Sequence, residues 1–216
     1  MTSESIVRCH CNDCRRRTDH DLVATRVVED LEELDERTAY RWTDTYVVLQ
    51  CRGCRAVCLQ DTFQDSAGNR QVGYYPPPVS RRAPTWRWEI PGEMRELSEE
   101  IYVALQNNGR RLALMGARTL VDMLMQKEIG DLGSFERKLE ELEKHGLIST
   151  QGRDVLSVAL DAGNAAAHRG YKPEEGDLNA VMDIVENLLE ATYHLSKVAA
   201  SVKKSTPTRS SKPRKP

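Results

Sequence analysis

No stretch of this sequence is apolar over a length that could cross a membrane. A membrane-spanning helix needs about 20 consecutive, predominantly apolar residues, and charged residues make up 30% of the chain and interrupt every apolar run. The first five residues also lack the apolar segment of a signal peptide. We therefore expect a cytoplasmic protein that does not contact the membrane.

Cysteine is absent from residues 59–216. All six cysteines lie within the first 58 residues: Cys9, Cys11, Cys14, Cys51, Cys54 and Cys58. In a cytoplasmic protein, clustered cysteines hold a metal ion more often than they form disulfides. The uneven distribution predicts two modules of different chemistry, and a chain of 216 residues is long enough for both.

Acidic residues are absent from residues 203–216, which carry six basic residues. The rest of the chain keeps 25 of the 31 basic residues against all 33 acidic ones, so its own balance is acidic. A tail rich in Ser, Pro and Lys is expected to be disordered. It could bind a phosphate backbone by releasing counterions, or simply keep the chain soluble.

Two Cys-x-x-Cys pairs, Cys11/Cys14 and Cys51/Cys54, share the same spacing. Four thiolates in this pattern predict a structural zinc site, which would contribute on the order of 10 kcal/mol to the folding of a small module. Such a site leaves no open position for catalysis. Cys9 could replace Cys11, and Cys58, His10 and His20 are further reserve ligands. The alternative is a set of reduced structural cysteines without metal.

The segments around the pairs predict β-hairpins. Residues 21–28 and 40–50 are rich in β-branched and aromatic residues and flank an acidic stretch, 29–37, which we interpret as a turn. A second hairpin is expected around the turn at residues 65–69. Both pairs also contain residues that tolerate a left-handed turn, Asn12, Asp13 and Gly53.

From Pro91 onward the apolar pattern becomes helical. Residues 110–129 are apolar almost all round, which predicts a buried central helix. Within it Arg118 and Asp122 stand at i, i+4, placed to pair with each other. Ser134 is expected to cap a third helix, and a fourth helix begins near Thr150. A last helix is expected at 177–202, where apolar residues alternate by three and four positions, the spacing of the apolar seam of a helical bundle.

The fourth helix carries an unusual polar set among small residues. Asp161, Asn164 and His168 fall at i, i+3 and i+7 and therefore share a face, beside alanines and Gly163 that allow another backbone to approach. This is typical of a site or of a tight interface.

The predicted fold class is α+β. We expect a small zinc-ribbon-like β module with hairpins at residues 1–92, a helical bundle of about five helices at 93–202, and a disordered basic tail at 203–216.

These motifs resemble a bacterial family known as domain of unknown function 4145. The resemblance covers most of the chain and rests on the paired Cys-x-x-Cys motifs, the alanine-arginine element that ends in an acid at residues 117–122, and the Gly-Asn-small-small-small-His element at residues 163–168. The last motif is the most specific. The helical part of this family is assigned to the HEPN superfamily, so the resemblance implies a HEPN-like bundle of four to five helices that often dimerises.

Active members of that superfamily resemble metal-independent ribonucleases of toxin–antitoxin, restriction or phage-defence systems, in which an arginine and a histidine meet at the dimer cleft. The resemblance therefore implies that His168 exchanges a proton with RNA and that an arginine holds the phosphate. This sequence departs from the family at that arginine, because Leu160 occupies its usual position. Arg118 or Arg169 could replace it.

Three hypotheses follow. The first is a non-catalytic or degenerate module that binds nucleic acid, RNA rather than DNA, or a protein partner such as an antitoxin, in restriction or phage defence. The second is a metal-independent ribonuclease, a homodimer built through the helical domain, with His168, Asn164, Arg118 and Asp122 at its site. The third is a structural dimerisation module. The alternative roles for these residues are structural: His168 makes hydrogen bonds at a helix end, and Arg118 and Asp122 form a buried ion pair.

Overall fold

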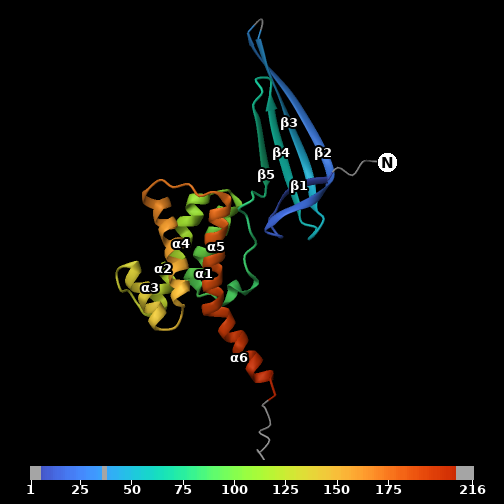
Figure 1. The fold of residues 1–216 in the computed structure, drawn as a ribbon. Helices are drawn as coiled ribbons and strands as arrows, with labels where there is room; N and C mark the ends of the chain where they lie inside the picture. The colour runs from blue at the N-terminus through green and yellow to red at the C-terminus, as the bar shows by residue number, and fades with distance from the viewer. Residues whose placement is uncertain (1–5, 36–37, 208–216) are drawn as a thin grey trace, which may run out of the picture. The chain divides into compact units, whose positions relative to one another are not determined.

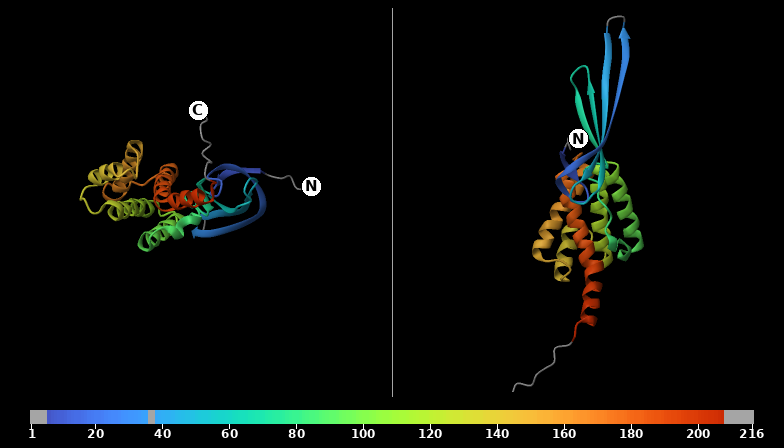
Figure 2. Two further views of the ribbon diagram at one scale, coloured as in Figure 1. Left: turned by 90° about the horizontal axis from the view of Figure 1, so that it is seen from below. Right: turned by 90° about the vertical axis from the view of Figure 1, so that its right-hand side faces the viewer.

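The computed structural model describes residues 6–35 and 38–207. A five-stranded antiparallel sheet is followed along the chain by helices (Figure 1), which confirms the predicted α+β class. The strands form a meander in the order β1-β2-β3-β4-β5, and the sheet is curled (Figure 2). The strands are β1 (Ile6–Cys11), β2 (Arg16–Asp35), β3 (Thr38–Cys51), β4 (Val57–Asp65) and β5 (Arg70–Tyr75).

The first predicted hairpin is confirmed, but its strands are longer than expected. β2 pairs with β3 from His20 opposite Cys51 as far as Asp35 opposite Thr38. The acidic stretch expected as a turn therefore lies mostly in β2. Its cross-strand partners include Tyr40 and Trp42, whose ring centroids lie 5.6 Å apart, and aromatic residues of this kind favour extended pairing. Residues 36–37 lie outside the described residues.

The second predicted hairpin is confirmed as β4 and β5. Its turn is organised by Asp65, which accepts hydrogen bonds from the backbone N–H groups of Ala67 and Asn69 and from the Asn69 side chain. The Tyr40 hydroxyl also donates to Asp65 over 2.7 Å. The Asn69 amide and the Tyr40 hydroxyl hold the pKa of the Asp65 carboxyl below its usual value. A charged acceptor thus ties this turn to β3.

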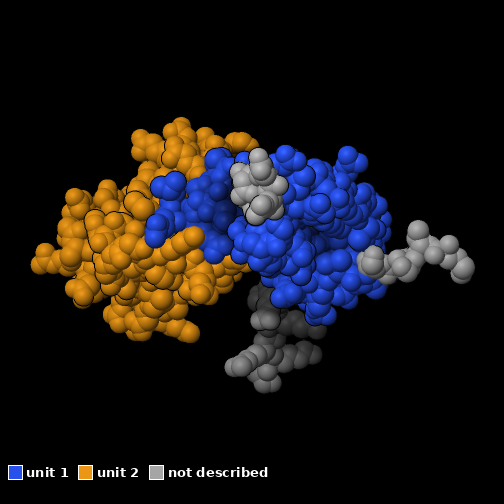
Figure 3. All heavy atoms as spheres, turned by 90° about the horizontal axis from the view of Figure 1, so that it is seen from above, with its two compact units in different colours: residues 1–82, 102–113 blue, residues 83–101, 114–216 orange. Residues whose placement is uncertain are grey.

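The chain divides into two compact units (Figure 3). One consists of Met1–Arg82 with Tyr102–Ala113, and the other of Ala83–Ile101 with Leu114–Pro216. The sequence-based limits at residues 92 and 202 stay a prediction.

The helices confirm the predicted bundle of about five. They are η1 (Thr85–Glu89), α1 (Gly92–Gln106), α2 (Arg110–Ile129), α3 (Phe135–Lys144), α4 (Thr150–His168) and α5 (Glu175–Leu189), which continues through η2 (Glu190–Leu195) into α6 (Ser196–Ser205). The predicted cap is confirmed, since the Ser134 side chain accepts from the Arg137 backbone N–H. Among the described residues no helix combines the length and apolar character that crossing a membrane requires.

The helical core is built from α1, α2, α4 and α5, with two leucines of α3 added. Its most deeply buried side chains include Leu114, Leu120, Leu124, Leu142 and Leu178. α2 supplies several of these residues, as expected of the predicted buried central helix, but Leu112 is 67% and Met115 38% exposed. Apolar residues on every face of a helix do not require partners on every face.

The last helix runs further than the sequence indicated. Its buried positions end at Leu189, while every residue of α6 is exposed. Lys203 and Lys204, the first two basic residues of the predicted disordered tail, lie in α6. Residues 208–216 of that tail lie outside the described residues.

Two glycines allow helices of the bundle to approach closely. A Cβ on Gly116 of α2 would lie 2.7 Å from Ile101 of α1, and a Cβ on Gly163 of α4 would lie 2.5 Å from the Cβ of Arg118 on α2. Non-bonded carbon atoms do not normally approach within about 3.5 Å of each other. The absence of a side chain at Gly163 therefore sets the contact between α2 and α4.

We expect Gly163→Ala to destabilise the bundle by about 1–3 kcal/mol, because the added methyl group overpacks the contact with Arg118. Gly152→Ala is the matched control in the same helix. Its Cβ meets nothing closer than 3.4 Å, and the gain in helix propensity should stabilise the chain by up to about 1 kcal/mol. Chemical denaturation followed by helical circular dichroism measures both, and equal effects of the two variants would contradict the packing role.

Candidate metal centre and helical site

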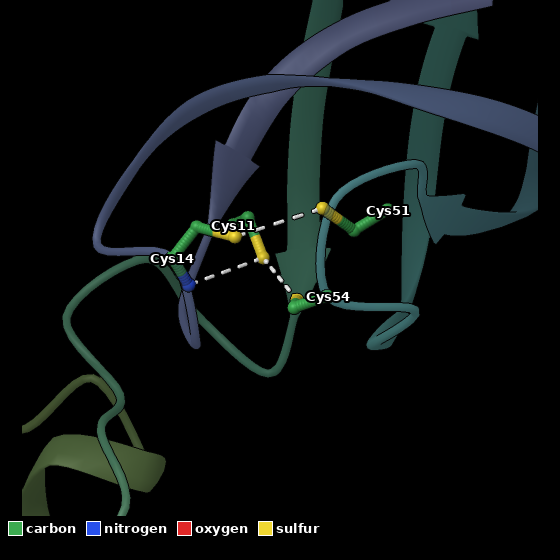
Figure 4. Close-up of side chains that lie close together, drawn as sticks. All are labelled: Cys11, Cys14, Cys51 and Cys54. Carbon is green, nitrogen blue, oxygen red and sulfur yellow. Dashed lines mark hydrogen bonds between the residues drawn. The ribbon is translucent and has the colours of Figure 1, made fainter.

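The two Cys-x-x-Cys pairs meet at one end of the sheet (Figure 4). Cys11 ends β1 and Cys51 ends β3, while Cys14 and Cys54 lie in the turns that follow. All four Sγ atoms lie within 4.8 Å of one another. The Sγ atoms of Cys11 and Cys54 are 3.4 Å apart and those of Cys14 and Cys51 are 3.8 Å apart. The structure therefore brings together the four cysteines that were predicted as metal ligands, and these residues could hold a metal ion.

Hydrogen bonds to sulfur favour the thiolate of Cys51, whereas burial disfavours the thiolate of Cys11. Burial raises the pKa of Cys51, but hydrogen bonds from the Thr18 hydroxyl, 3.3 Å away, and from the backbone N–H groups of Cys54 and Gly53 outweigh it and lower that pKa to about 6. Burial raises the pKa of Cys11 to about 12, against the backbone N–H of Cys14. A bound dication would stabilise all four thiolates, and four thiolates suit zinc.

The left-handed residues of the turns differ from the prediction. Arg15 (φ 53°) and Arg55 (φ 68°), each directly after the second cysteine of a pair, adopt this conformation. Asn12 and Gly53 do not have a positive φ. The Asn12 side chain instead donates to the Pro77 carbonyl over 3.0 Å, which fastens the first turn to residues downstream of the sheet.

Three of the predicted reserve ligands form a separate cluster. Cys9, His20 and Cys58 place their ligand atoms within 4.8 Å of one another, and Cys9 Sγ lies 3.3 Å from His20 Nδ1. Cys9 therefore belongs to this second group rather than standing in for Cys11. In the sequence, the cluster is indicated only by two cysteines that stand two residues apart on one strand. That spacing does not indicate that β4 supplies the third ligand of the cluster.

The prediction that Arg118 and Asp122 form an ion pair with each other is wrong. Asp122 accepts from the buried ammonium group of Lys138 on α3 over 2.8 Å, and Lys138 also lies 3.5 Å from Asp131. The guanidinium group of Arg118 lies over the Phe135 ring, 4.3 Å from its centroid. A lysine from another helix competes successfully for Asp122 because burial makes an unpaired ammonium group costly.

Asn164 and His168 lie on α4 as predicted, and Asn164 follows the glycine that contacts Arg118. His168 is exposed in the last turn of α4. No hydrogen bond of either side chain is found within residues 6–35 and 38–207. The neighbouring Arg169 donates to the Asp161 carboxylate over 2.6 Å. The structure thus packs Arg118 against Gly163, the residue before Asn164, and binds Asp122 and Arg169 to other groups.

The arginines around the four-cysteine cluster were not predicted to be part of a site. Arg15, Arg16 and Arg17 directly follow Cys14, and Arg52 and Arg55 flank Cys54, and all five are exposed. Arg8, Arg16, Arg17 and Arg52 line a hollow of about 430 Å³ with Thr18, Asp19 and Gly53. The signal was available in the sequence, as a run of arginines next to each Cys-x-x-Cys pair.

Comparison with known proteins gives one match. The family model described as a domain of unknown function (DUF4145) matches residues 99–205. No curated protein and no solved structure matches the chain. The matched range covers most of the helices and leaves the cysteine clusters outside it.

We expect Cys54→Ser to lose one zinc ion per chain relative to the wild type. Cys54 is exposed, so the change removes a thiolate without opening a cavity, and the β module loses stabilisation on the order of 10 kcal/mol. Arg52→Ser, in the same turn, is the control that keeps both zinc and fold. Elemental analysis and limited proteolysis of residues 6–75 measure the two effects. A metal-free preparation whose β module resists proteolysis would contradict this role.

Proposed function

The chain belongs, through residues 99–205, to the DUF4145 family, and from this premise we propose that it is a zinc-stabilised module that binds RNA without cleaving it. The binding surface in this proposal is the arginine-lined hollow beside the four-cysteine cluster. The helical domain then serves as a degenerate HEPN-like scaffold, which also carries the predicted dimer contact and a place in restriction or phage defence.

The observation that carries the proposal is the concentration of guanidinium groups at the hollow. Guanidinium groups bind phosphate through paired charge-assisted hydrogen bonds, and a positively charged groove that follows a backbone is typical of single-strand binding. The carboxylate of Asp19 lies 3.6 Å from Arg8, and that of Asp21 lies 3.2 Å from Arg52. The four arginines that line the hollow still outnumber these two acids.

The helical site gives less support to the ribonuclease alternative. General acid–base cleavage needs two proton-transferring groups close to the reacting phosphate, with a cation to stabilise developing charge. His168 is exposed, Arg118 stacks on Phe135, and Arg169 is paired with Asp161. Each arginine that could replace the family arginine already has a structural partner, so the geometry favours binding over catalysis.

RNA rather than DNA is the ligand because the superfamily that the helical part resembles acts on RNA. The exposed lysines at the end of α6, Lys203 and Lys204, and the basic residues that follow them would add contacts to phosphate that do not depend on sequence.

We expect the triple variant Arg16→Ala/Arg17→Ala/Arg52→Ala to bind single-stranded RNA at least tenfold more weakly than the wild type near physiological salt. Each lost phosphate contact lowers the slope of log K against log salt by about 0.7 for a single strand, so the slope should fall by about 2. Fluorescence anisotropy with a labelled oligonucleotide over a salt series measures both quantities.

The control is Arg26→Ala/Arg41→Ala/Arg70→Ala, which removes the same charge from exposed positions of β2, β3 and β5 outside the hollow. It should keep most of the affinity. Equal losses in the two triple variants would mean that net charge alone drives binding, and an absence of RNA binding by the wild type would refute the proposal.

We expect no cleavage when the purified chain is incubated with a mixed RNA pool, with or without EDTA, because no partner that could share a proton with the His168 side chain is found among the residues that the structure describes. His168→Ala should leave RNA affinity within about twofold of the wild type. Gel electrophoresis of the RNA measures cleavage. Cleavage that survives EDTA and disappears in His168→Ala would establish the metal-independent ribonuclease instead.

A further inference from the structure

We propose that Cys9, His20 and Cys58 form a second zinc site, separate from the four-cysteine cluster, with one coordination position open to a cavity. Each ligand comes from a different strand, β1, β2 and β4 respectively. A site of this composition differs in kind from the first, because three protein ligands leave room for an exogenous fourth.

The distances between the three side chains suit a common metal ion. Their ligand atoms all lie within 4.8 Å of one another, and Cys9 Sγ is 3.3 Å from His20 Nδ1. Zinc binds sulfur at about 2.3 Å and nitrogen at about 2.0–2.1 Å, so its tetrahedral ligands lie roughly 3.5 Å apart. β1 and β4 are not neighbours in the sheet, and yet the Sγ atoms of Cys9 and Cys58 lie within 4.8 Å of each other. The curl of the sheet therefore creates this cluster.

The Nδ1 atom of His20 is the ring nitrogen that lies near Cys9. It is 3.3 Å from Cys9 Sγ and 3.0 Å from the Thr18 carbonyl oxygen. Without metal, an Nδ1–H group can donate to that carbonyl and keep the ring in place, since His20 is 1% exposed. With metal bound, the neutral tautomer that carries its proton on Nε2 would leave the lone pair of Nδ1 available to the ion.

The fourth position faces a cavity of about 200 Å³. His20 and Cys58 line this cavity together with Arg81 and Arg82, and Cys58 is partly exposed to it. Water would fit as the fourth ligand. The guanidinium group of Arg82 lies 2.9 Å from the carboxylate of Asp13, which also lines the cavity. The four-cysteine cluster has no equivalent position, since its four thiolates complete a tetrahedron.

The ligand chemistry points to zinc rather than to a hard cation. Two thiolates and one imidazole are soft to borderline ligands, whereas calcium and magnesium bind oxygen. Cys9 and His20 are both buried, and a metal ion would bind the two thiolates, which as thiols form only weak hydrogen bonds.

The test is the zinc content of the full chain, purified with a phosphine reductant after growth in zinc-supplemented medium. We expect two zinc ions per chain in the wild type and one in Cys9→Ser/Cys58→Ser. X-ray absorption should detect a nitrogen ligand in the wild type and only sulfur ligands in the double variant. His10→Ala, which also lines the cavity, is the control and should keep two ions.

One zinc ion with four sulfur ligands in the wild type would overturn the proposal, as would two ions in the double variant. A disulfide between Cys9 and Cys58 in the reduced wild-type protein, detected by mass spectrometry, would overturn it as well. Retention of the four-sulfur spectrum shows that the double variant is still folded around the first site. If that variant does not fold, His20→Gln, which leaves all six thiols in place, must lose the same single ion.

Discussion

The β module depends on the convergence of four sulfur atoms at one end of its sheet. Two of them end β1 and β3 and two lie in the following turns, all within 4.8 Å of one another. As thiolates they would repel one another, and as thiols they make only weak hydrogen bonds. A dication would resolve this conflict, because it would replace repulsion between the thiolates by attraction to a common centre. It would thereby join the β1–β2 and β3–β4 connections across β2.

The helical domain depends on a different constraint, the close approach of α2 and α4 at Gly163. Because no side chain stands there, the aliphatic part of Arg118 fills the contact and its guanidinium group reaches the Phe135 ring of α3. The same region buries Lys138 against Asp122. Charged residues of α2 thus serve to hold three helices together. This use of Arg118 and Asp122 explains why two residues of a family-like element are poorly placed to act on a substrate.

The parts of the fold that could be predicted are those encoded by neighbouring residues. The Cys-x-x-Cys spacing, the Asp65 turn and the Ser134 cap depend on contacts over a few positions, and each was predicted correctly. The partner of Asp122 was not, because Lys138 lies sixteen residues away on another helix and nothing in the local pattern ranks it above Arg118. The cluster of Cys9, His20 and Cys58 likewise requires the curl of the sheet. Side-chain contacts that depend on the curvature of a sheet, or on competition between residues of different helices, cannot be predicted from a single sequence.

The conformation of Arg15 and Arg55 bears on what the four-cysteine end of the sheet does. Residues other than glycine, asparagine and aspartate adopt the left-handed conformation at a cost of roughly 1–2 kcal/mol. Elsewhere among the described residues, five glycines take a positive φ, and Asn108 is the other residue that does so. The chain therefore uses tolerant residues at its other left-handed turns and arginine at the two that follow a cysteine pair. Arg15 directly precedes Arg16, which lines the arginine-lined hollow, so the phosphate binding that we propose would give a reason for a cationic side chain rather than glycine at that position.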